Sequence, residues 1–277
     1  MNSAPRSRAP IGVFDSGVGG LSVLRALRAQ LPQEDFVYLS DAAHAPYGER
    51  SEEYVGGRAL RVADFLLDQQ GVKALVVACN TATAAAVQAL RARWPALPII
   101  GIEPALKPAA AASQTRVVGV MATRGTLESG KFKALLDGLE GQARFVLQPC
   151  DGLAAAIEEG DADATLKLCK KYIGQLGPFG GSTGRIDQLV LGCTHYPLVG
   201  DVLQTLVGPD TALVDPGGPV SLQTRRVLDQ AGLLHPNGTP GTTLLLSTGA
   251  GDALRHNAQR WLGLDQPVGT ARTDSPD

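Results

Sequence analysis

The sequence LVLGCTHYP, residues 189–197, joins an apolar run to a polar turn. Leu189, Val190 and Leu191 are typical of a buried strand, because aliphatic and β-branched side chains fill the interior of a sheet. The run ends at Cys193, which is followed at once by a hydroxyl and an imidazole side chain. Similar apolar runs alternate along the chain with longer Ala-, Leu- and Arg-rich stretches. This alternation predicts an α/β fold with mainly parallel sheets.

Seven apolar runs are expected to form strands, and the stretches between them include four clear helix candidates. The expected strands are residues 11–14, 36–39, 74–78, 98–102, 117–121, 145–147 and 188–191. The expected helices are residues 21–31, 52–69, 82–94 and 153–157, with Gly or Pro near their ends. Ligands of open parallel sheets bind beyond the carboxyl ends of the strands. The polar loops at four such ends are therefore expected to line one pocket: DSGVGG (15–20), SDAAHAPYGER (40–50), CNTAT (79–83) and CTHYP (193–197).

A faint internal repeat divides the sequence into two halves. IGVFDSG (11–17) is similar in form to VGVMATRG (118–125), and each is followed some 60 to 70 residues later by an apolar strand that ends in a cysteine motif. The first motif is Cys79-Asn-Thr and the second is Cys193-Thr-His. Two similar halves would therefore each deliver one cysteine.

Composition and charge limit the class of protein. The chain has 277 residues, of which 44% are hydrophobic, and a formal net charge of −2, so it can bury a sizeable core. Its basic residues are scattered, which argues against a nucleic-acid or anionic-membrane partner and favours a small molecule. Residues 1–10 precede no apolar signal core, and no stretch has the length of a membrane span, so we expect a cytoplasmic protein. Its four cysteines form no CxxC pair and are expected to be free thiols.

The two motif cysteines admit several interpretations. A free cysteine is most often a small buried hydrophobe, but Cys79 and Cys193 each stand at the polar end of a strand among hydrogen-bonding neighbours. A metal site would need three or four ligands, and the histidines other than His195 are unclustered, so no metal is expected. A Cys/His nucleophile for acyl transfer is conceivable. That mechanism leaves Cys79 without a role.

The DSGVGG loop follows a strand and opens a helix, as phosphate-binding loops do, but it lacks both the GxGxxG spacing and the GK[ST] ending. It offers backbone N–H groups, the hydroxyl of Ser16 and the carboxylate of Asp15, which suit a small ion carrying amine and acid groups. Alternatively, Asp15 caps the following helix.

Together these motifs resemble the glutamate racemase family. The resemblance rests on DSGVGGLSV (15–23), SDAAHAPYGER (40–50), VVACNTAT (76–83), LVLGCTHYPL (189–198) and LLLSTGAGDALRHNAQRWLG (244–263), and covers residues 11–264. It implies an amino-acid racemase without a cofactor, built from two similar, pseudo-symmetric α/β domains with the active site between them. The expected domains are residues 1–104 plus 217–277, and residues 105–216.

Racemisation at Cα removes a proton from one face and returns one to the other, so it needs two opposed acid–base groups within reach of one carbon. The resemblance assigns these roles to the two motif cysteines, with four assisting residues: Cys79 and Cys193 with Asp15, Asp41, Glu158 and His195. Glu159 is adjacent to Glu158, and the sequence does not decide between them. The implied substrate contacts are Asp15, Ser16, Tyr47, Gly48, Asn80, Thr81, Thr123, Thr126, Thr194 and His195. Tyr47 could equally be an ordinary half-buried aromatic residue, and Cys150 and Cys169 are expected to be structural.

The implied reaction converts L-glutamate to D-glutamate for peptidoglycan precursors. Alternatives are a racemase for aspartate or another amino acid, a single-cysteine decarboxylase, or a non-catalytic ligand-binding or thiol-sensing protein. A homodimer is compatible with the sequence, which does not define its geometry. The sequence departs from the family pattern at His44, at VDPGGP (214–219) and in the Gly-rich stretch PFGGSTG (178–184), all outside the two cysteine motifs.

Overall fold

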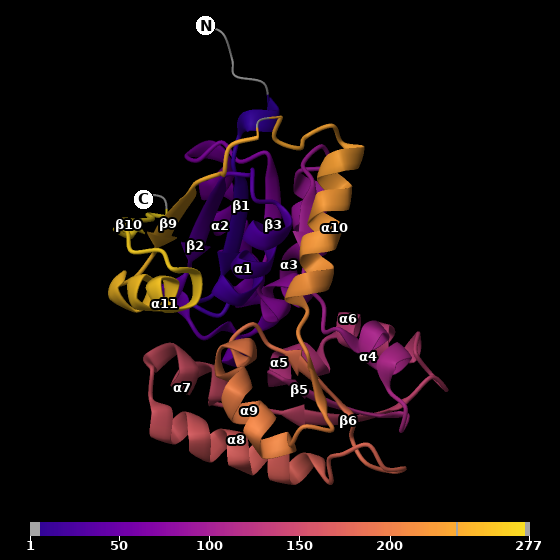
Figure 1. Ribbon diagram of the computed structural model, residues 1–277. Coiled ribbons are helices and arrows are strands. Elements are labelled where there is room, and N and C mark those ends of the chain that lie inside the picture. Colours follow the sequence, from indigo (N-terminus) through magenta and orange to yellow (C-terminus); the bar gives the residue numbers. More distant parts are fainter. Residues whose placement is uncertain (1–5, 237, 275–277) are drawn as a thin grey trace, which may run out of the picture.

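The computed structural model describes residues 6–236 and 238–274 and contains two sheets, each made of parallel strands and flanked by helices (Figure 1). The first sheet has the strand order β10-β9-β2-β1-β3-β4 and the second has the order β6-β5-β7-β8. We call each sheet with its packed helices a lobe. The first sheet contains β1 (Ile11–Asp15), β2 (Phe36–Ser40), β3 (Ala74–Val77), β4 (Ile99–Gly101), β9 (Thr243–Ser247) and β10 (Gly269–Thr270). The second contains β5 (Val117–Ala122), β6 (Arg144–Pro149), β7 (Gln188–Gly192) and β8 (Ala212–Val214).

The internal repeat of the sequence corresponds to a repeated strand order. Four strands of the first sheet lie in the order β2-β1-β3-β4, and the second sheet follows the same scheme as β6-β5-β7-β8. In both sheets, the second strand lies on one side of the first strand, and the third and fourth strands lie on its other side. The crevice beyond the carboxyl ends at such a crossover point is where ligands of these sheets bind. The strands that border this crevice are β3 and β7, and Cys79 and Cys193 lie two residues and one residue beyond their ends.

Helices cover both faces of the first sheet. One face packs against α1 (Leu21–Gln30), α10 (Gly217–Gln230) and α11 (Asp252–Leu262), and the other against α2 (Glu52–Asp68) and α3 (Asn80–Arg93). Successive side chains of β1 serve the two cores in turn, because side chains alternate across a strand: Val13 faces the α1 side and Phe14 faces the α2 side.

The second sheet is covered in the same way. One face packs against α4 (Leu106–Ala112) and α6 (Gly130–Asp137), and the other against α7 (Leu153–Glu159), α8 (Ala162–Leu176) and α9 (Gly200–Val207). The short helix α5 (Arg124–Glu128) follows β5 and lies against the first lobe beside the 3₁₀ turn Tyr47–Glu49. A local signal marks the start of α8, where the Asp161 side chain accepts a hydrogen bond from the Ala164 N–H at 2.9 Å.

The predicted α/β fold is confirmed, and all seven expected strands are present, with ends shifted by one or two residues. Strands β8, β9 and β10 were not among those expected. The long helix α3 begins at Asn80 rather than at residue 82, because Cys79 itself is its N-cap. The chain passes from the first lobe to the second in residues 102–105 and returns to the first in residues 215–216, between elements that pack on different sheets. The expected domain limits at 104 and 217 stay a prediction.

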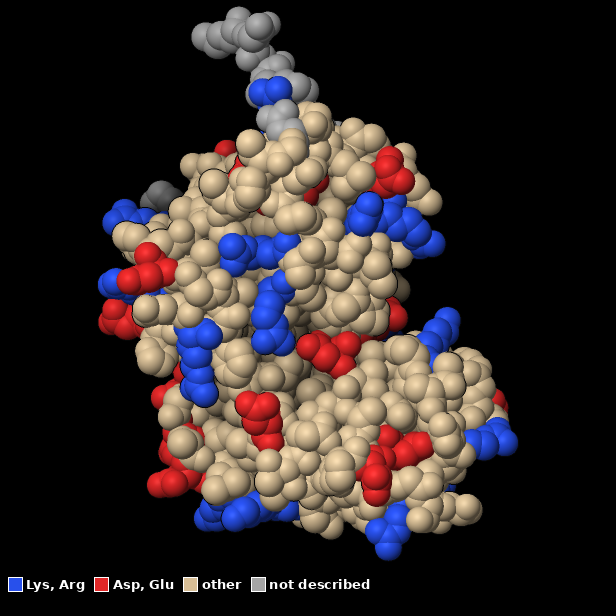
Figure 2. Space-filling view, in the orientation of Figure 1, with Lys and Arg blue, Asp and Glu red and all other residues tan. Residues whose placement is uncertain are grey.

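Charged side chains of both signs are spread over the face of the molecule drawn in Figure 2. Figure 2 shows Lys and Arg side chains interspersed with Asp and Glu over one face, without a broad basic stripe on that face. Within residues 6–236 and 238–274, no helix is long and apolar enough to cross a membrane.

Candidate active site

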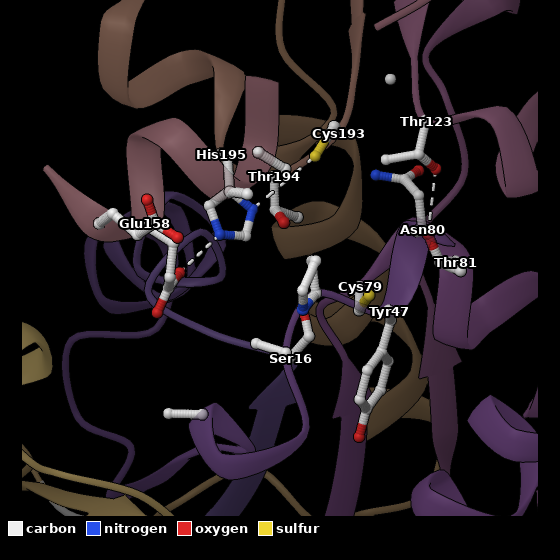
Figure 3. Close-up of a pocket in the computed structure, with 18 residues that line it drawn as sticks. Ser16, Tyr47, Cys79, Asn80, Thr81, Thr123, Glu158, Cys193, Thr194 and His195 are labelled. Carbon is white, nitrogen blue, oxygen red and sulfur yellow. Dashed lines mark hydrogen bonds and ion pairs between the residues drawn. The ribbon is translucent and has the colours of Figure 1, made fainter. Parts of the chain in front are cut away.

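A cavity of about 230 Å³ lies between the two lobes, at the carboxyl ends of β1, β3, β5 and β7 (Figure 3). Eleven of the residues expected in the site line it: Ser16, Tyr47, Gly48, Cys79, Asn80, Thr81, Thr123, Glu158, Cys193, Thr194 and His195. The cavity therefore receives side chains from both halves of the repeat, with one cysteine from each. Both thiols are buried, at 5% and 6% exposure for Cys79 and Cys193, and all four cysteines are free.

Cys79 sits where β3 gives way to α3. Its Sγ accepts a hydrogen bond from the Ala82 N–H at 3.5 Å, so the thiol occupies the place of a helix-capping side chain. Burial, and next the negative charge of nearby Asp15, raise the pKa of the Cys79 thiol well above its usual range. In this state of the site Cys79 is held as a neutral thiol, which is the form of a proton donor.

Cys193 has different neighbours. Its Sγ lies 3.8 Å from His195 Nδ1, and His195 Nε2 lies 2.7 Å from Glu158 Oε2. Burial lowers the pKa of His195, but its hydrogen bonds to Cys193 and Glu158 outweigh burial and raise the pKa well above the usual value. Burial raises the pKa of Glu158, and the bond to His195 outweighs it and lowers that pKa. The result is an imidazolium between a carboxylate and a sulfur.

The structure distinguishes Glu158 from Glu159. Both line the cavity, but Glu158 makes the bond to His195 and also accepts one from the Val18 N–H at 2.8 Å, whereas Glu159 is exposed. The Val18 amide belongs to the DSGVGG loop, whose N–H groups were expected to face a bound ion. At Val18 that N–H is used for a protein carboxylate instead.

Asp15 lies behind the cavity wall, fully buried at the end of β1. It accepts hydrogen bonds from the Ser16 N–H at 2.7 Å and from Thr194 Oγ1 at 3.0 Å, so it joins the two lobes. Burial raises the pKa of Asp15, and the positive charge of His195 opposes this shift. The alternative that Asp15 caps the next helix is wrong, because the N-cap of α1 is Gly20 and no side chain caps it.

Asp41 is also behind the wall rather than in it. The Tyr47 hydroxyl donates to its Oδ2, Arg58 donates to both of its oxygens at 2.9 and 3.1 Å, and Thr248 Oγ1 donates at 2.9 Å. Tyr47 itself is 1% exposed, not half-buried, and its ring forms part of the cavity wall. Asp41 is therefore placed to hold Tyr47, with Arg58 neutralising its charge.

Hydroxyl and amide groups occupy the side of the cavity near Cys79. Thr81 Oγ1 lies 3.1 Å from Thr123 Oγ1, which lies 2.9 Å from Thr126 Oγ1, so these hydroxyls bridge the lobes. Thr126 stands behind Thr123 and is buried. The Asn80 side chain points toward the cavity (Figure 3), and neither its Oδ1 nor its Nδ2 has a hydrogen-bond partner among the described residues. A buried amide of this kind is ready to bind a ligand, because an unsatisfied polar group is costly.

Some lining residues were not expected from the sequence. Ala154 and Ala155 of α7 line the cavity beside Glu158, as do Ala42, Ala45, Pro46 and Gly192. Small apolar residues carry no chemical signal, and only their adjacency to SDAAHAPYG, CTHYP and Glu158 could have suggested them. Cys150 and Cys169 lie in the core, where burial raises the pKa of Cys169 to about 11. No group of three or more metal-ligating side chains occurs among the described residues.

The fold and the site define an α/β protein of two similar lobes that share one functional cavity and place one buried cysteine each in it. The sequence pattern of the family "Asp/Glu/Hydantoin racemase" matches residues 11–218, and the chain belongs to that family.

Comparison with individual relatives narrows the assignment from the family to one kind of racemase. The chain is 52% identical over 231 residues to the glutamate racemase of Ectopseudomonas mendocina, covering 83% of this chain and 86% of that protein. The crystal structure of glutamate racemase RacE1 from Bacillus anthracis is similar with a TM-score of 0.84 at 32% identity, covering 96% of this chain and 98% of that one. Glutamate racemase from Francisella tularensis in complex with D-glutamate has a TM-score of 0.81 at 29% identity, covering 97% and 99%. Within its family, the chain is an isomerase of the glutamate racemase type.

Proposed function

We propose that the enzyme interconverts L- and D-glutamate without a cofactor, using Cys79 and Cys193 as opposed acid–base groups. The observation that carries this proposal is the placement of two buried free thiols, one from each lobe, at a single cavity. A hydrolase or an acyl transferase would need only one of them. Two opposed proton-transfer groups are what inversion at a carbon requires.

The proposed reaction has two balanced steps. A thiolate removes the proton from Cα of glutamate, which converts that cysteine to a thiol and leaves a carbanion whose charge spreads onto the adjacent carboxylate. The thiol of the opposite cysteine then donates its proton to the other face of Cα and becomes a thiolate. The product has the opposite configuration, and the two cysteines have exchanged protonation states.

The surroundings of the two cysteines support a defined starting state. The raised pKa of Cys79 favours its thiol form. A protonated His195, held by Glu158 at 2.7 Å, stabilises negative charge on the Cys193 sulfur. The enantiomer whose Cα–H faces Cys193 therefore meets a sulfur with a positive charge 3.8 Å away, whereas the other enantiomer meets Cys79, which has a carboxylate nearby.

Glutamate is proposed as the substrate because the relatives include a racemase whose crystal structure contains D-glutamate. The polar groups of the wall suit an amino acid: the unpaired amide of Asn80 and the hydroxyls of Ser16, Thr81, Thr123 and Thr194 offer donors and acceptors without a strong base. D-Glutamate made here would supply peptidoglycan precursors. Thiol catalysis needs reduced cysteines, which is consistent with the expected cytoplasmic location.

Circular dichroism tests the activity directly. L- and D-glutamate, and in parallel L- and D-aspartate, are incubated with purified enzyme without added cofactor, and the loss of optical activity is followed. We expect glutamate of either hand to be racemised much faster than aspartate. Faster racemisation of aspartate would reassign the substrate, and no signal at high enzyme concentration would refute the racemase activity.

Isotope exchange tests the mechanism. In D₂O at low conversion, the product enantiomer should carry deuterium at Cα, while the remaining substrate stays largely protiated, because the thiol that took its hydrogen returns the same one. A single-base mechanism would carry some original hydrogen into the product. Substantial protium in newly formed product, measured by mass spectrometry of the separated enantiomers, would contradict the opposed-cysteine mechanism.

A further inference from the structure

The loop between β1 and α1, residues 16–20, lies directly against the acid–base group of the second lobe. The Val18 N–H donates to Glu158 Oε2 at 2.8 Å, and the same oxygen is 2.7 Å from His195 Nε2. One carboxylate oxygen therefore receives a backbone N–H from the first lobe and the imidazole that contacts Cys193 in the second. The orientation of His195 depends on Glu158, and that of Glu158 depends on the opposite lobe.

The glycines of this loop make the close approach sterically feasible. A Cβ atom on Gly17 would lie 2.1 Å from Glu158 Oε2, and one on Gly19 would lie 2.4 Å from His195 Nδ1. Both distances are far below van der Waals contact, so any side chain would displace the carboxylate or the imidazole. Neither glycine has a positive φ angle. Glycine is therefore required here for space next to Glu158 and His195, not for backbone conformation.

The loop is itself held firmly. The buried Tyr38 hydroxyl donates to the Gly17 carbonyl at 2.6 Å. Ser22 Oγ is 2.9 Å from the Gly19 carbonyl and 3.0 Å from the Thr194 carbonyl, so it ties the loop to the cysteine motif of the other lobe. A loop fixed from behind can determine the position of the groups that press on it.

We propose that Gly17, the Val18 amide and Gly19 are positioning residues that align Glu158 and His195 on Cys193, so that this alignment is complete only while the lobes are in contact. This inference rests on the proposed two-cysteine function. Cys79 takes its N–H donor, Ala82, from its own lobe, and its carboxylate neighbour Asp15 accepts a hydrogen bond from Thr194 of the second lobe. Separation of the lobes would remove the Val18 bond from Glu158, and with it the alignment of His195 on Cys193.

A double-mutant cycle tests the inference. The variants are Gly17→Ala, Glu158→Ala and the combination, with thermal melts to show that each is folded. If Gly17 acts by aligning Glu158, Gly17→Ala should lower kcat by roughly ten- to a hundredfold, somewhat below the ~10²–10⁴ of a general acid or base itself. The double variant should be no slower than Glu158→Ala alone, because the new methyl group then meets empty space.

Deuterium isotope effects separate alignment from general damage. With C2-deuterated L- and D-glutamate, impaired proton transfer at Cys193 should raise the isotope effect on kcat/KM in the direction that starts at Cys193 and lower it in the other. Gly17→Ala should shift the two effects in the same sense as Glu158→Ala. Matched controls are Gly57→Ala in α2 and Gly174→Ala in α8, where a Cβ meets nothing within 4 Å, and both should stay within twofold of wild type.

The inference is overturned if Gly17→Ala stays within twofold of wild type, if the losses in the double variant multiply, or if both isotope effects change equally. The proposed function has a separate test. If Cys193→Ala keeps wild-type activity, the two-cysteine mechanism is wrong whatever the glycine variants do.

Discussion

Replacing His195 with asparagine removes the positive charge beside Cys193 and leaves Cys193 and Glu158 in place. The Cys193 sulfur and His195 Nδ1 are 3.8 Å apart. At that distance, with an effective dielectric constant of about 20, opposite unit charges attract by about 4 kcal/mol. Because about 1.4 kcal/mol corresponds to a factor of ten in rate, full loss of this attraction slows the reaction by about three orders of magnitude. The asparagine amide can still donate a hydrogen bond, so we expect a loss in kcat/KM of about 10²–10³.

The direction of the effect gives a sharper test than its size. The two enantiomers have equal free energy in water, so kcat/KM must fall equally in both directions, whichever cysteine is affected. The primary isotope effects are free to differ. With C2-deuterated substrates, His195→Asn should raise the isotope effect for the enantiomer that Cys193 deprotonates and lower it for the other, and Asp15→Asn should do the reverse.

His256 is exposed on α11, away from the cavity, and His256→Asn should leave both rates and both isotope effects unchanged. The reasoning is refuted if His195→Asn reduces kcat/KM by less than tenfold, or if the two isotope effects move together. In either case His195 would be a group that holds substrate and not the partner of Cys193.

Three further predictions concern the four cysteines, the Arg58–Asp41 ion pair and the pH dependence of stability. Cys79→Ala and Cys193→Ala should each abolish racemisation by the circular dichroism assay, whereas Cys150→Ala and Cys169→Ala, in the core, should retain it within a few fold; activity in either motif variant would contradict the mechanism. Arg58→Met should lower the free energy of unfolding in urea by about 3–5 kcal/mol, because it leaves the buried Asp41 carboxylate unpaired. The matched variant Arg61→Met, at a 62% exposed side chain, should lower it by less than about 1 kcal/mol, and equal losses would show that the Asp41 pair is not special. The folded pKa of His195 is raised above its unfolded value of about 6.5, so its stabilising contribution is complete below about pH 6.5 and is lost as the pH rises through the folded pKa. The difference in free energy of unfolding between wild type and His195→Asn should therefore shrink with rising pH. A difference that grows with pH would show that the pKa shift has the opposite sign.

The strands and both cysteine positions could be predicted from the sequence because their signals are local. Each is an apolar run of a few residues that ends in polar groups, and the parallel arrangement brings such ends to one edge. The same locality explains the omissions. β9 pairs with β2 across some 200 residues, and β8 and β10 are only three and two residues long.

The partners of the site residues could not be read in the same way, because they depend on contacts distant in sequence. Glu158 meets Val18 across 140 positions, and the choice between Glu158 and Glu159 follows from which face of α7 turns to the β1–α1 loop. Asp41 meets Thr248 across 207 positions and accepts the Tyr47 hydroxyl, so its contacts behind the cavity wall could not be read from the local sequence. Polar residue type was visible in the sequence, whereas geometry alone separated groups in the wall from groups behind it.

The repeated fold and the unlike partners of the two cysteines are compatible for a thermodynamic reason. Repetition of the strand order places Cys79 and Cys193 at equivalent points of two sheets, as the proposed inversion at one carbon requires. Their surroundings then differ: a buried carboxylate, Asp15, lies near one, and an imidazolium with its carboxylate lies near the other. No catalyst changes an equilibrium, so this asymmetry leaves the ratio of the two enantiomers at one. It can change only the barriers of the two proton transfers and the protonation states of the free enzyme. The fold thus needs symmetry only in the positions of the two sulfur atoms, and the residues around each thiol remain free to differ.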